Sequence, residues 1–330
     1  MGSRLLWGRA LGNVLSLLLM SVCSAVTSDF EFDGPGPYSW ERSSDVQLQV
    51  PDSTGCKDSQ CSAIVSLTVP MLPAGKDSKE VVAVAVLSPG FLVAKESYNS
   101  YAERFASWGI ATVQWQPGSE TMFDAMTHET LAHFLPWLIA FAKDQLGDRI
   151  PDLPEILLVG HSRGAKISFL AAASGLVLPE AIMGLDPVDK SSFDKEDVSV
   201  LPLMGHISAP TLIVGSELGN VSMMGQSCAP TGSNYASFFE SSRSPTWSLE
   251  IFEAGHMQFL DPCCASCISC LVMKKMCAAG SQSDSVVQEV AKTAAVAWIH
   301  YARGAANISR YEQDWARELK LTHTASSKVK

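Results

Sequence analysis

Residues 156–164 read ILLVGHSRG and carry the most structural information of any segment in the sequence. The first four of them are apolar, as in a short strand that is buried on both faces of a sheet. The motif Gly-x-Ser-x-Gly follows directly, and residues 164–174 have helical character. A strand before this motif and a helix after it are typical of a nucleophile elbow, a strained turn that exposes the serine hydroxyl. Ser162 is therefore the candidate nucleophile, and an ordinary turn with a serine cap is the alternative.

Similar apolar runs recur along the chain and alternate with helix-like segments. The predicted buried strands are residues 81–87, 111–115, 156–159, 181–185, 211–214 and 249–252. The predicted helices are residues 98–108, 129–145, 164–174 and 284–301. This alternation predicts one α/β domain with a mostly parallel, doubly wound sheet and helices on both faces. An antiparallel hairpin, residues 46–50 with 63–69, is expected to precede the parallel strands.

Charge and composition exclude several classes of protein. The 330 residues include 34 acidic and 24 basic side chains, which give a formal net charge of -10. Proteins that bind nucleic acid usually gather Lys and Arg on one face, so we expect no nucleic-acid partner. With 47% hydrophobic and 18% charged residues, the composition is that of a globular chain. The sequence contains neither a dinucleotide-binding glycine motif nor a zinc-binding H-E-x-x-H helix, so we expect no cofactor and no metal.

The N-terminal 28 residues have the pattern of a signal or targeting peptide. Arg4 and Arg9 precede the apolar run 14–20, and small residues follow it. This run is shorter than the roughly 20 residues of a transmembrane helix, and an uncleaved membrane anchor is the alternative. We therefore predict a targeting segment (1–28), one α/β domain (29–322) and a polar C-terminal tail (323–330).

Nine cysteines indicate an oxidising compartment. Removal of the targeting segment takes away Cys23 and leaves eight, an even number. Five of them lie close together at positions 263, 264, 267, 270 and 277. Closely spaced thiolates can share a zinc ion, but no histidine lies among them. Disulfides are therefore favoured over a metal, and their pairing stays open.

A serine needs a base before its hydroxyl becomes a good nucleophile. In folds with this elbow the chain order is serine, then acid, then histidine, so the base should follow the last strand. Of the seven histidines, His256 lies in the loop directly after the predicted strand 249–252. His256 is therefore the candidate base.

Two acids lie where a group that orients the histidine is expected. Asp186 follows the predicted strand 181–185, and Glu217 follows the strand 211–214. Pro187 restricts the backbone next to Asp186, which favours Asp186 as the acid. Glu217 stays as the alternative, and Asp189 is expected to be a solvated loop charge.

A serine nucleophile with a base and an acid is typical of ester hydrolysis, and that reaction also needs backbone N–H donors for the oxyanion. One should be Arg163, directly after the serine, and the second should come from the loop after the strand 81–87. That loop reads SPGFL, residues 88–92. Proline has no N–H and glycine permits a close approach, so Phe91 is the predicted second donor.

Two long connections, residues 187–210 and 215–247, should leave the carboxyl edge of the sheet, where open α/β sheets bind ligands. Apolar side chains there and near the oxyanion loop are candidate walls of a substrate pocket. The alternative is that they only pack the loops onto the sheet. The residues concerned are Leu92, Trp115, Met223, Met224, Phe238 and Phe239.

Several of these segments resemble the chlorophyllases of plants and algae, which are α/β-hydrolases. GHSRG (160–164) resembles the signature of that family, although Ala165 stands where the family has another glycine. PGFL (89–92) with YNSY (98–101) resembles its oxyanion loop, with Pro89 where a histidine commonly stands. GLDPVD (184–189), CAPTGSN (228–234) and GHM (255–257) resemble further family segments. The resemblance covers roughly residues 81–270.

The resemblance implies an α/β-hydrolase in which Ser162, Asp186 and His256 form the triad, because the family's acid belongs to the D-P-V segment. It further implies hydrolysis of the phytyl ester of chlorophyll, an apolar substrate, together with peripheral membrane contact and a plastid location. Without the resemblance, the N-terminal segment predicts secretion. A cutinase-like or lipid-ester hydrolase is the alternative function, and a non-catalytic pigment or lipid binder is a further one.

Overall fold

The computed structural model describes residues 32–330 apart from 58–59, 72–80, 82, 122–123, 152, 191–197, 224–225, 244, 264–267, 305–312 and 314–322. The predicted targeting segment, residues 1–28, lies outside the described residues. None of the helices in the described part is both long enough and apolar enough to span a bilayer. Residues Phe32–Lys330 form one compact unit, as expected for a single α/β domain.

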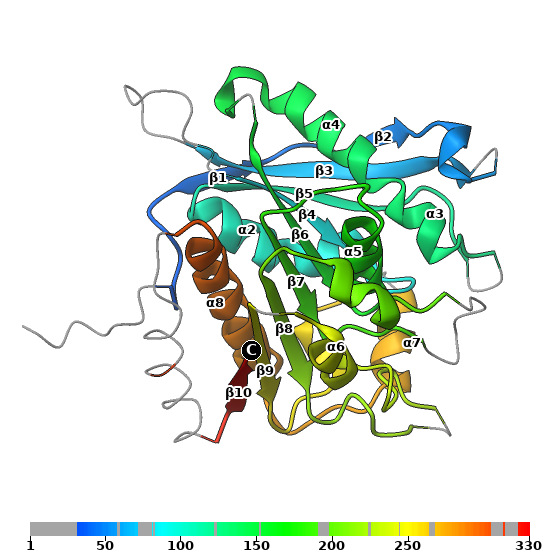
Figure 1. Cartoon of the computed structure of the whole chain (residues 1–330), viewed down its shortest axis with the longest axis vertical. Helices are drawn as coiled ribbons and strands as arrows, with labels where there is room; N and C mark the ends of the chain where they lie inside the picture. The colour runs from blue at the N-terminus through cyan, green and yellow to red at the C-terminus, as the bar shows by residue number, and fades with distance from the viewer. Residues whose placement is uncertain are drawn as a thin grey trace, which may run out of the picture. The chain divides into compact units, whose positions relative to one another are not determined.

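One twisted sheet runs through this unit (Figure 1). In the described residues its strands are β1 (Ser39–Arg42), β2 (Val46–Gln49), β3 (Ser62–Met71), β4 (Ala83–Ser88), β5 (Ile110–Pro117), β6 (Glu155–His161), β7 (Ala181–Leu185), β8 (Thr211–Ser216), β9 (Thr246–Ile251) and β10 (Ala325–Val329). The order across the sheet is β1-β3-β5-β4-β6-β7-β8-β9-β10, and β2 pairs with β3. The strands from β4 to β9 are parallel to one another, whereas β1, β2 and β10 pair with their neighbours in antiparallel fashion.

The strand order reverses at β4, because β5 lies on one side of it and β6 on the other. All six residues of β4 are buried, as the continuous apolar run predicts. The register pairs Ser88 with Gly160 and Gly160 with Gly184, so β4, β6 and β7 end at the same edge of the sheet. The loops that follow these three strands therefore meet where open α/β sheets bind ligands.

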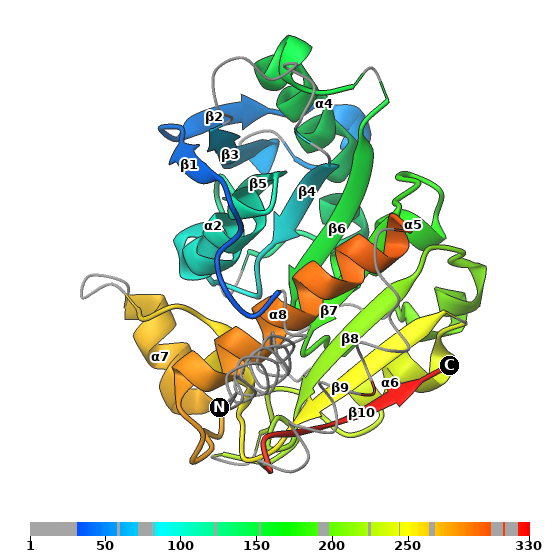
Figure 2. The same ribbon diagram turned by 90° about the vertical axis from the view of Figure 1, so that its left-hand side faces the viewer.

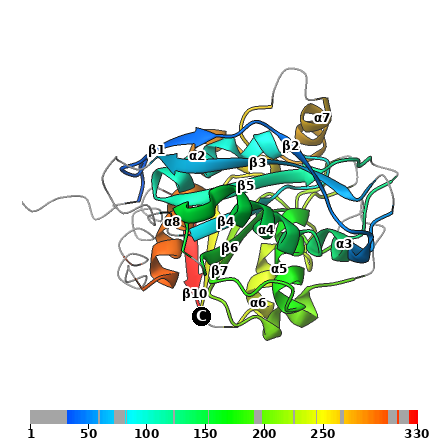
Figure 3. The ribbon, with the colours of Figure 1, turned by 90° about the horizontal axis from the view of Figure 1, so that it is seen from above.

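Helices cover both faces of the sheet (Figures 2 and 3). The α-helices of the described part are α2 (Asn99–Ser107), α3 (His128–Ala132), α4 (Leu135–Leu146), α5 (Arg163–Ala173), α6 (Tyr235–Ser241), α7 (Ile268–Met276) and α8 (Asp284–Ala302). Short 3-10 segments are η1 (Asp52–Thr54), η3 (Lys95–Tyr98), η4 (Gly147–Arg149), η5 (Leu201–His206) and η6 (His256–Phe259). Helices α2 and α8 lie on one face, and α4, α5 and α6 lie on the other.

The predicted hairpin and the six predicted parallel strands are confirmed, with shifts of a few residues at their ends. The predicted helix 129–145 is instead two helices, α3 and α4, which are separated at His133 and Phe134. Pro136 lies in the first turn of α4, where its missing N–H is tolerated, and it cannot continue a preceding helix.

The prediction of a polar tail at residues 323–330 needs correction. Its residues Ala325–Val329 form β10, which pairs antiparallel with β9 at the edge of the sheet. The Lys330 ammonium group donates to the carbonyl oxygens of Phe239, at 2.7 Å, and Glu240, at 2.9 Å, near the end of α6. The polar sequence of this segment is compatible with an edge strand, because one face of such a strand is exposed to solvent.

Candidate active site

Ser162 occupies a strained turn between β6 and α5. Its backbone has φ 55° and ψ -123°, a conformation that side chains other than glycine rarely adopt. The flanking glycines make this turn possible. A Cβ at Gly160 would lie 2.2 Å from the carbonyl carbon of Gly164, and one at Gly164 would lie 2.1 Å from the carbonyl oxygen of Ser88. The local geometry is that of a nucleophile elbow.

His256 lies between Ser162 and Asp186. Its Nε2 atom is 2.9 Å from the Ser162 Oγ, and its Nδ1 atom is 2.7 Å from the Asp186 Oδ2. His256 is the first residue of η6 and is buried, as is Asp186. Because a carboxylate can only accept, Nδ1 carries the hydrogen of the neutral ring and Nε2 is free to accept the serine hydroxyl proton. This is the arrangement that a serine nucleophile and its base require.

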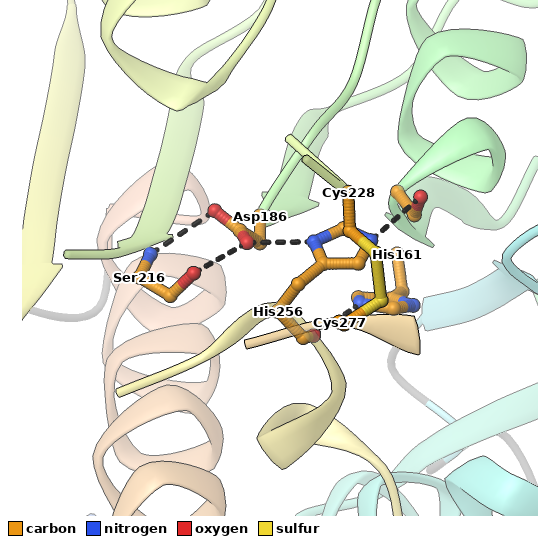
Figure 4. Close-up of a disulfide and its surroundings, with 7 residues drawn as sticks. His161, Asp186, Ser216, Cys228, His256 and Cys277 are labelled. Carbon is orange, nitrogen blue, oxygen red and sulfur yellow. Dashed lines mark hydrogen bonds and ion pairs between the residues drawn. A yellow bond between two sulfur atoms is a disulfide. The ribbon is translucent and has the colours of Figure 1, made fainter. Parts of the chain in front are cut away.

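The Asp186 carboxylate is held by more than the histidine. Ser216, at the end of β8, donates its backbone N–H to Oδ1 at 3.0 Å and its hydroxyl to Oδ2 at 2.6 Å (Figure 4). These two donors fix the direction of the carboxylate. Asp186 also has a positive φ of 41°, so two residues of the arrangement have strained backbones.

The two other acids have different surroundings. Glu217 is exposed and accepts the backbone N–H of Glu253 at 2.7 Å, so it braces the turn that precedes His256. Asp189 is buried, and the prediction of a solvated charge is wrong. The buried Lys166 ammonium donates to the Asp189 carbonyl oxygen at 2.6 Å, and the carboxylate accepts the N–H of Val200 at 2.7 Å. Buried charge must be paired, which explains this cluster beside the Asp186 loop.

The loop after β4, which contains Phe91, contacts the first residue of α5. The Arg163 guanidinium lies over the Phe91 ring, 5.0 Å from its centroid, and forms two hydrogen bonds with Glu120 at 2.5 and 2.8 Å. Both members of this ion pair are buried. Arg163 is the first residue of α5, where backbone N–H groups lack partners within the helix and the helix dipole favours negative charge. The role of the Phe91 and Arg163 N–H groups as oxyanion donors stays a prediction.

Comparison with known proteins identifies the family of this chain. Residues 45–312 match the family model described as Chlorophyllase. The chain belongs to the chlorophyllase family. Among its relatives, "Chlorophyllase-1, chloroplastic" of Citrus sinensis is 26% identical over 234 residues, 69% of each chain. Its counterpart in Citrus unshiu is 26% identical over 64% of this chain and 65% of the relative. "Chlorophyllase type 0" of Chenopodium album is 26% identical over 60% of this chain and 61% of the relative.

Family membership confirms the resemblance and the α/β-hydrolase fold. Two of the predicted pocket residues, however, lie in the hydrophobic core. Trp115 is fully buried, donates its indole N–H to the Ser88 hydroxyl at 3.2 Å and packs against Phe134. Phe238 is also fully buried and packs against Phe169, with ring centroids 5.3 Å apart. Neither side chain can line an open pocket, because neither has exposed surface.

The other predicted pocket residues of this chlorophyllase-family chain lie in different places. Leu92 lines a cleft of about 280 Å³ together with Glu120 and the segments 93–94 and 116–118. Phe239 lines a separate cleft of about 160 Å³ beside β9 and β10, and the Lys330 ammonium lies 4.8 Å from its ring centroid. Met223 is 41% exposed, and Met224 lies outside the described residues.

A disulfide lies beside the histidine. Cys228, in the connection between β8 and β9, is bonded to Cys277, which follows α7 (Figure 4). A second disulfide joins Cys56 and Cys61, and Cys263 is also disulfide-bonded. In the described residues, the one group of side chains close enough to share a metal ion is Asp52 with Cys56 and Cys61, whose sulfurs are already bonded to each other. Disulfides are thus confirmed.

The sequence did not single out every residue that shapes the site. Ser216 follows a predicted strand at the carboxyl edge of the sheet, which is a usable signal for a partner of the acid. His161 and Tyr98 lie within segments that resemble the family. Their mutual contact could not be predicted, because the two residues are 63 positions apart in the chain. Glu120 carries no local signal, because its partner Arg163 is 43 residues away in the chain.

Proposed function

We propose that this chain is a serine carboxylic-ester hydrolase that cleaves the phytyl ester of chlorophyll to chlorophyllide and phytol. The observation that carries the proposal is the buried chain of contacts from Ser162 through His256 to Asp186. Membership of the chlorophyllase family supports the substrate class. We assign Ser162 as nucleophile, His256 as general base and acid, and Asp186 as the group that orients the base.

The reaction follows from these positions. His256 Nε2 accepts the Ser162 hydroxyl proton while Oγ bonds to the ester carbonyl carbon. The carbonyl oxygen becomes negative, and we assign the N–H groups of Phe91 and Arg163 as the donors that stabilise it. The C–O bond to the alcohol then breaks, and protonated His256 gives its proton to the departing phytol oxygen. Water then gives a proton to His256 and attacks the acyl carbon, the bond from that carbon to Oγ breaks, and His256 returns the proton to Oγ, which releases chlorophyllide and restores Ser162.

Substrate contact is part of the same proposal. We place part of the apolar substrate in the cleft that contains Leu92, because this cleft adjoins the loop of Phe91 and the Arg163–Glu120 pair. Chlorophyll carries a long apolar alcohol and resides in membranes, so the enzyme would meet it by peripheral contact with a membrane surface. The chloroplastic names of two relatives support a plastid location, and the disulfides support passage through an oxidising compartment.

Purified wild type and Ser162→Ala test the proposal. Each protein is incubated with chlorophyll, with a triacylglycerol and with p-nitrophenyl butyrate, and chlorophyllide, free fatty acid and p-nitrophenol are measured. We expect chlorophyllide from the wild type and no product from Ser162→Ala. Hydrolysis of the lipid ester without chlorophyllide would make the chain a lipid-ester hydrolase instead. No hydrolysis of any ester, with chlorophyll still bound, would make it a pigment binder.

A further inference from the structure

His161 precedes the nucleophile and its side chain is completely buried. Its Nδ1 atom lies 2.9 Å from the Tyr98 hydroxyl oxygen, and its Nε2 atom lies 3.0 Å from the backbone carbonyl oxygen of His256. The Tyr98 oxygen also accepts the backbone N–H of Gly90 at 2.9 Å. Two buried side chains therefore connect the oxyanion loop, the elbow strand and the loop of the catalytic base.

The chemistry of these groups allows one arrangement of hydrogens. The His256 carbonyl can only accept, so His161 Nε2 carries the hydrogen and Nδ1 is bare. The Tyr98 hydroxyl then donates to Nδ1 while its oxygen accepts the Gly90 N–H. Each donor meets an acceptor, which makes this a fully satisfied buried network of the kind that holds a unique geometry.

Neither side chain is charged in this environment. Burial lowers the pKa of His161 well below its ordinary value of 6.5, and the charge of nearby His256 acts in the same direction. Burial likewise raises the pKa of the Tyr98 hydroxyl. The His161 and His256 rings lie 4.7 Å apart between centroids. When His256 takes up the serine proton, its neighbour therefore adds no second positive charge.

We propose that His161 and Tyr98 are positioning residues for ester hydrolysis. They hold the His256 loop and the oxyanion loop at fixed positions relative to Ser162. His161 tethers the backbone of His256, and Tyr98 fixes both the His161 ring and the Gly90 backbone. The inference rests on the proposed serine hydrolase chemistry. A shift of about 1 Å in such groups can cost about 100-fold in rate, so the network should act on turnover more than on substrate binding.

Conservative variants separate positioning from packing. Tyr98→Phe removes the hydroxyl and keeps the ring. Tyr101→Phe is its matched control, because Tyr101 is equally buried, three residues away, and its hydroxyl has no hydrogen-bond partner within the described part of the chain. His161→Leu removes both ring contacts, whereas the amide of His161→Gln can still donate to the His256 carbonyl.

The readouts are kcat and KM for p-nitrophenyl butyrate, and the rate at which a fluorophosphonate probe labels Ser162. We expect Tyr98→Phe to lower kcat and the labelling rate about 10-fold or more with KM within about twofold, and Tyr101→Phe to match the wild type. His161→Leu should lose about 100-fold in both rates, and His161→Gln should recover part of that loss.

Two outcomes overturn the inference. One is a Tyr98→Phe variant with the kcat and labelling rate of Tyr101→Phe. The other is a His161→Gln variant that is no faster than His161→Leu while both remain folded by circular dichroism. If His161→Leu does not fold, the two tyrosine variants still decide. A wild type that labels at Ser162 but leaves chlorophyll intact refutes the proposed substrate and leaves the positioning role standing.

Discussion

The Cys228–Cys277 disulfide should contribute more to this protein than the Cys56–Cys61 disulfide. The two bonds close segments of very different length, with sequence separations of 49 and 5 residues. The chain-entropy relation for loops of these sizes yields a contribution to the free energy of unfolding of about 4 kcal/mol for the long loop and about 2 kcal/mol for the short one. Replacement of each pair by serine should therefore destabilise the protein unequally.

The long disulfide should also affect activity, because it joins two segments that contact the site. The residue after Cys228, Ala229, donates its N–H to the Gly219 carbonyl at 2.9 Å, and Gly219 packs so tightly that a Cβ there would lie 2.9 Å from the Asp186 Oδ2. The residue after Cys277 packs against the residue before His256, since a Cβ at Gly255 would lie 2.0 Å from the Ala278 carbonyl oxygen. Loss of the bond should loosen both Asp186 and His256.

The double variants Cys228→Ser/Cys277→Ser and Cys56→Ser/Cys61→Ser form a matched pair for this test. Urea unfolding followed by tryptophan fluorescence measures stability, and p-nitrophenyl butyrate turnover measures activity. We expect the first variant to lose about 4 kcal/mol and much of its kcat, and the second to lose about 2 kcal/mol with its kcat retained. Equal losses of stability would refute the loop-length reasoning. An unchanged kcat in the first variant would refute the idea that the Cys228–Cys277 bond holds the segments around Asp186 and His256 in place.

Three further predictions concern single acids and one histidine. Asp186→Asn should lower kcat by about 10⁴-fold because the wrong tautomer of the base is favoured, whereas Glu217→Gln should change it little; steady-state kinetics of both variants decide between the two acids. Glu120→Gln leaves the buried Arg163 charge unpaired and should lower the free energy of unfolding by about 3 kcal/mol, as measured by urea unfolding; a loss below about 1 kcal/mol would contradict this. Burial lowers the pKa of His128 from 6.5 to about 2, so its unfolded form binds a proton that the folded form does not. The free energy of unfolding should therefore fall by about 1.4 kcal/mol per pH unit from this residue as pH drops below 6.5, and His128→Gln should flatten that slope between pH 6 and pH 4.

Local patterns in the sequence predicted the six parallel strands, and they singled out Ser162, Asp186 and His256, which the structure brings within hydrogen-bond distance of one another. A buried strand needs only a short apolar run, and the elbow needs only a serine between glycines at the end of such a run. His256 and Asp186 could be chosen because each follows a strand, and strands in a parallel sheet bring their carboxyl ends to one edge. These features depend on local windows of the chain and on one rule of topology.

Tertiary structure decided the features that depend on partners distant in the chain. Asp189 stands in a loop that reads as solvated, yet Lys166 pairs with it from α5. The polar segment Ala325–Val329 became a strand because the free edge of β9 offers unpaired backbone groups. Phe238 could face a pocket or the core, and only the packing of α6 against Phe169 placed it in the core.

The pairing of Cys228 with Cys277, and the contacts of His161 with Tyr98 and the His256 backbone, have the same origin. The two cysteines are 49 residues apart in the chain, and His161 is 63 residues from Tyr98 and 95 residues from His256. A residue's type tells which partners its side chain accepts. Which partner it meets is decided by the packing of helices on the sheet, because side-chain hydrogen bonds and disulfides need distances of a few ångström that no local pattern specifies.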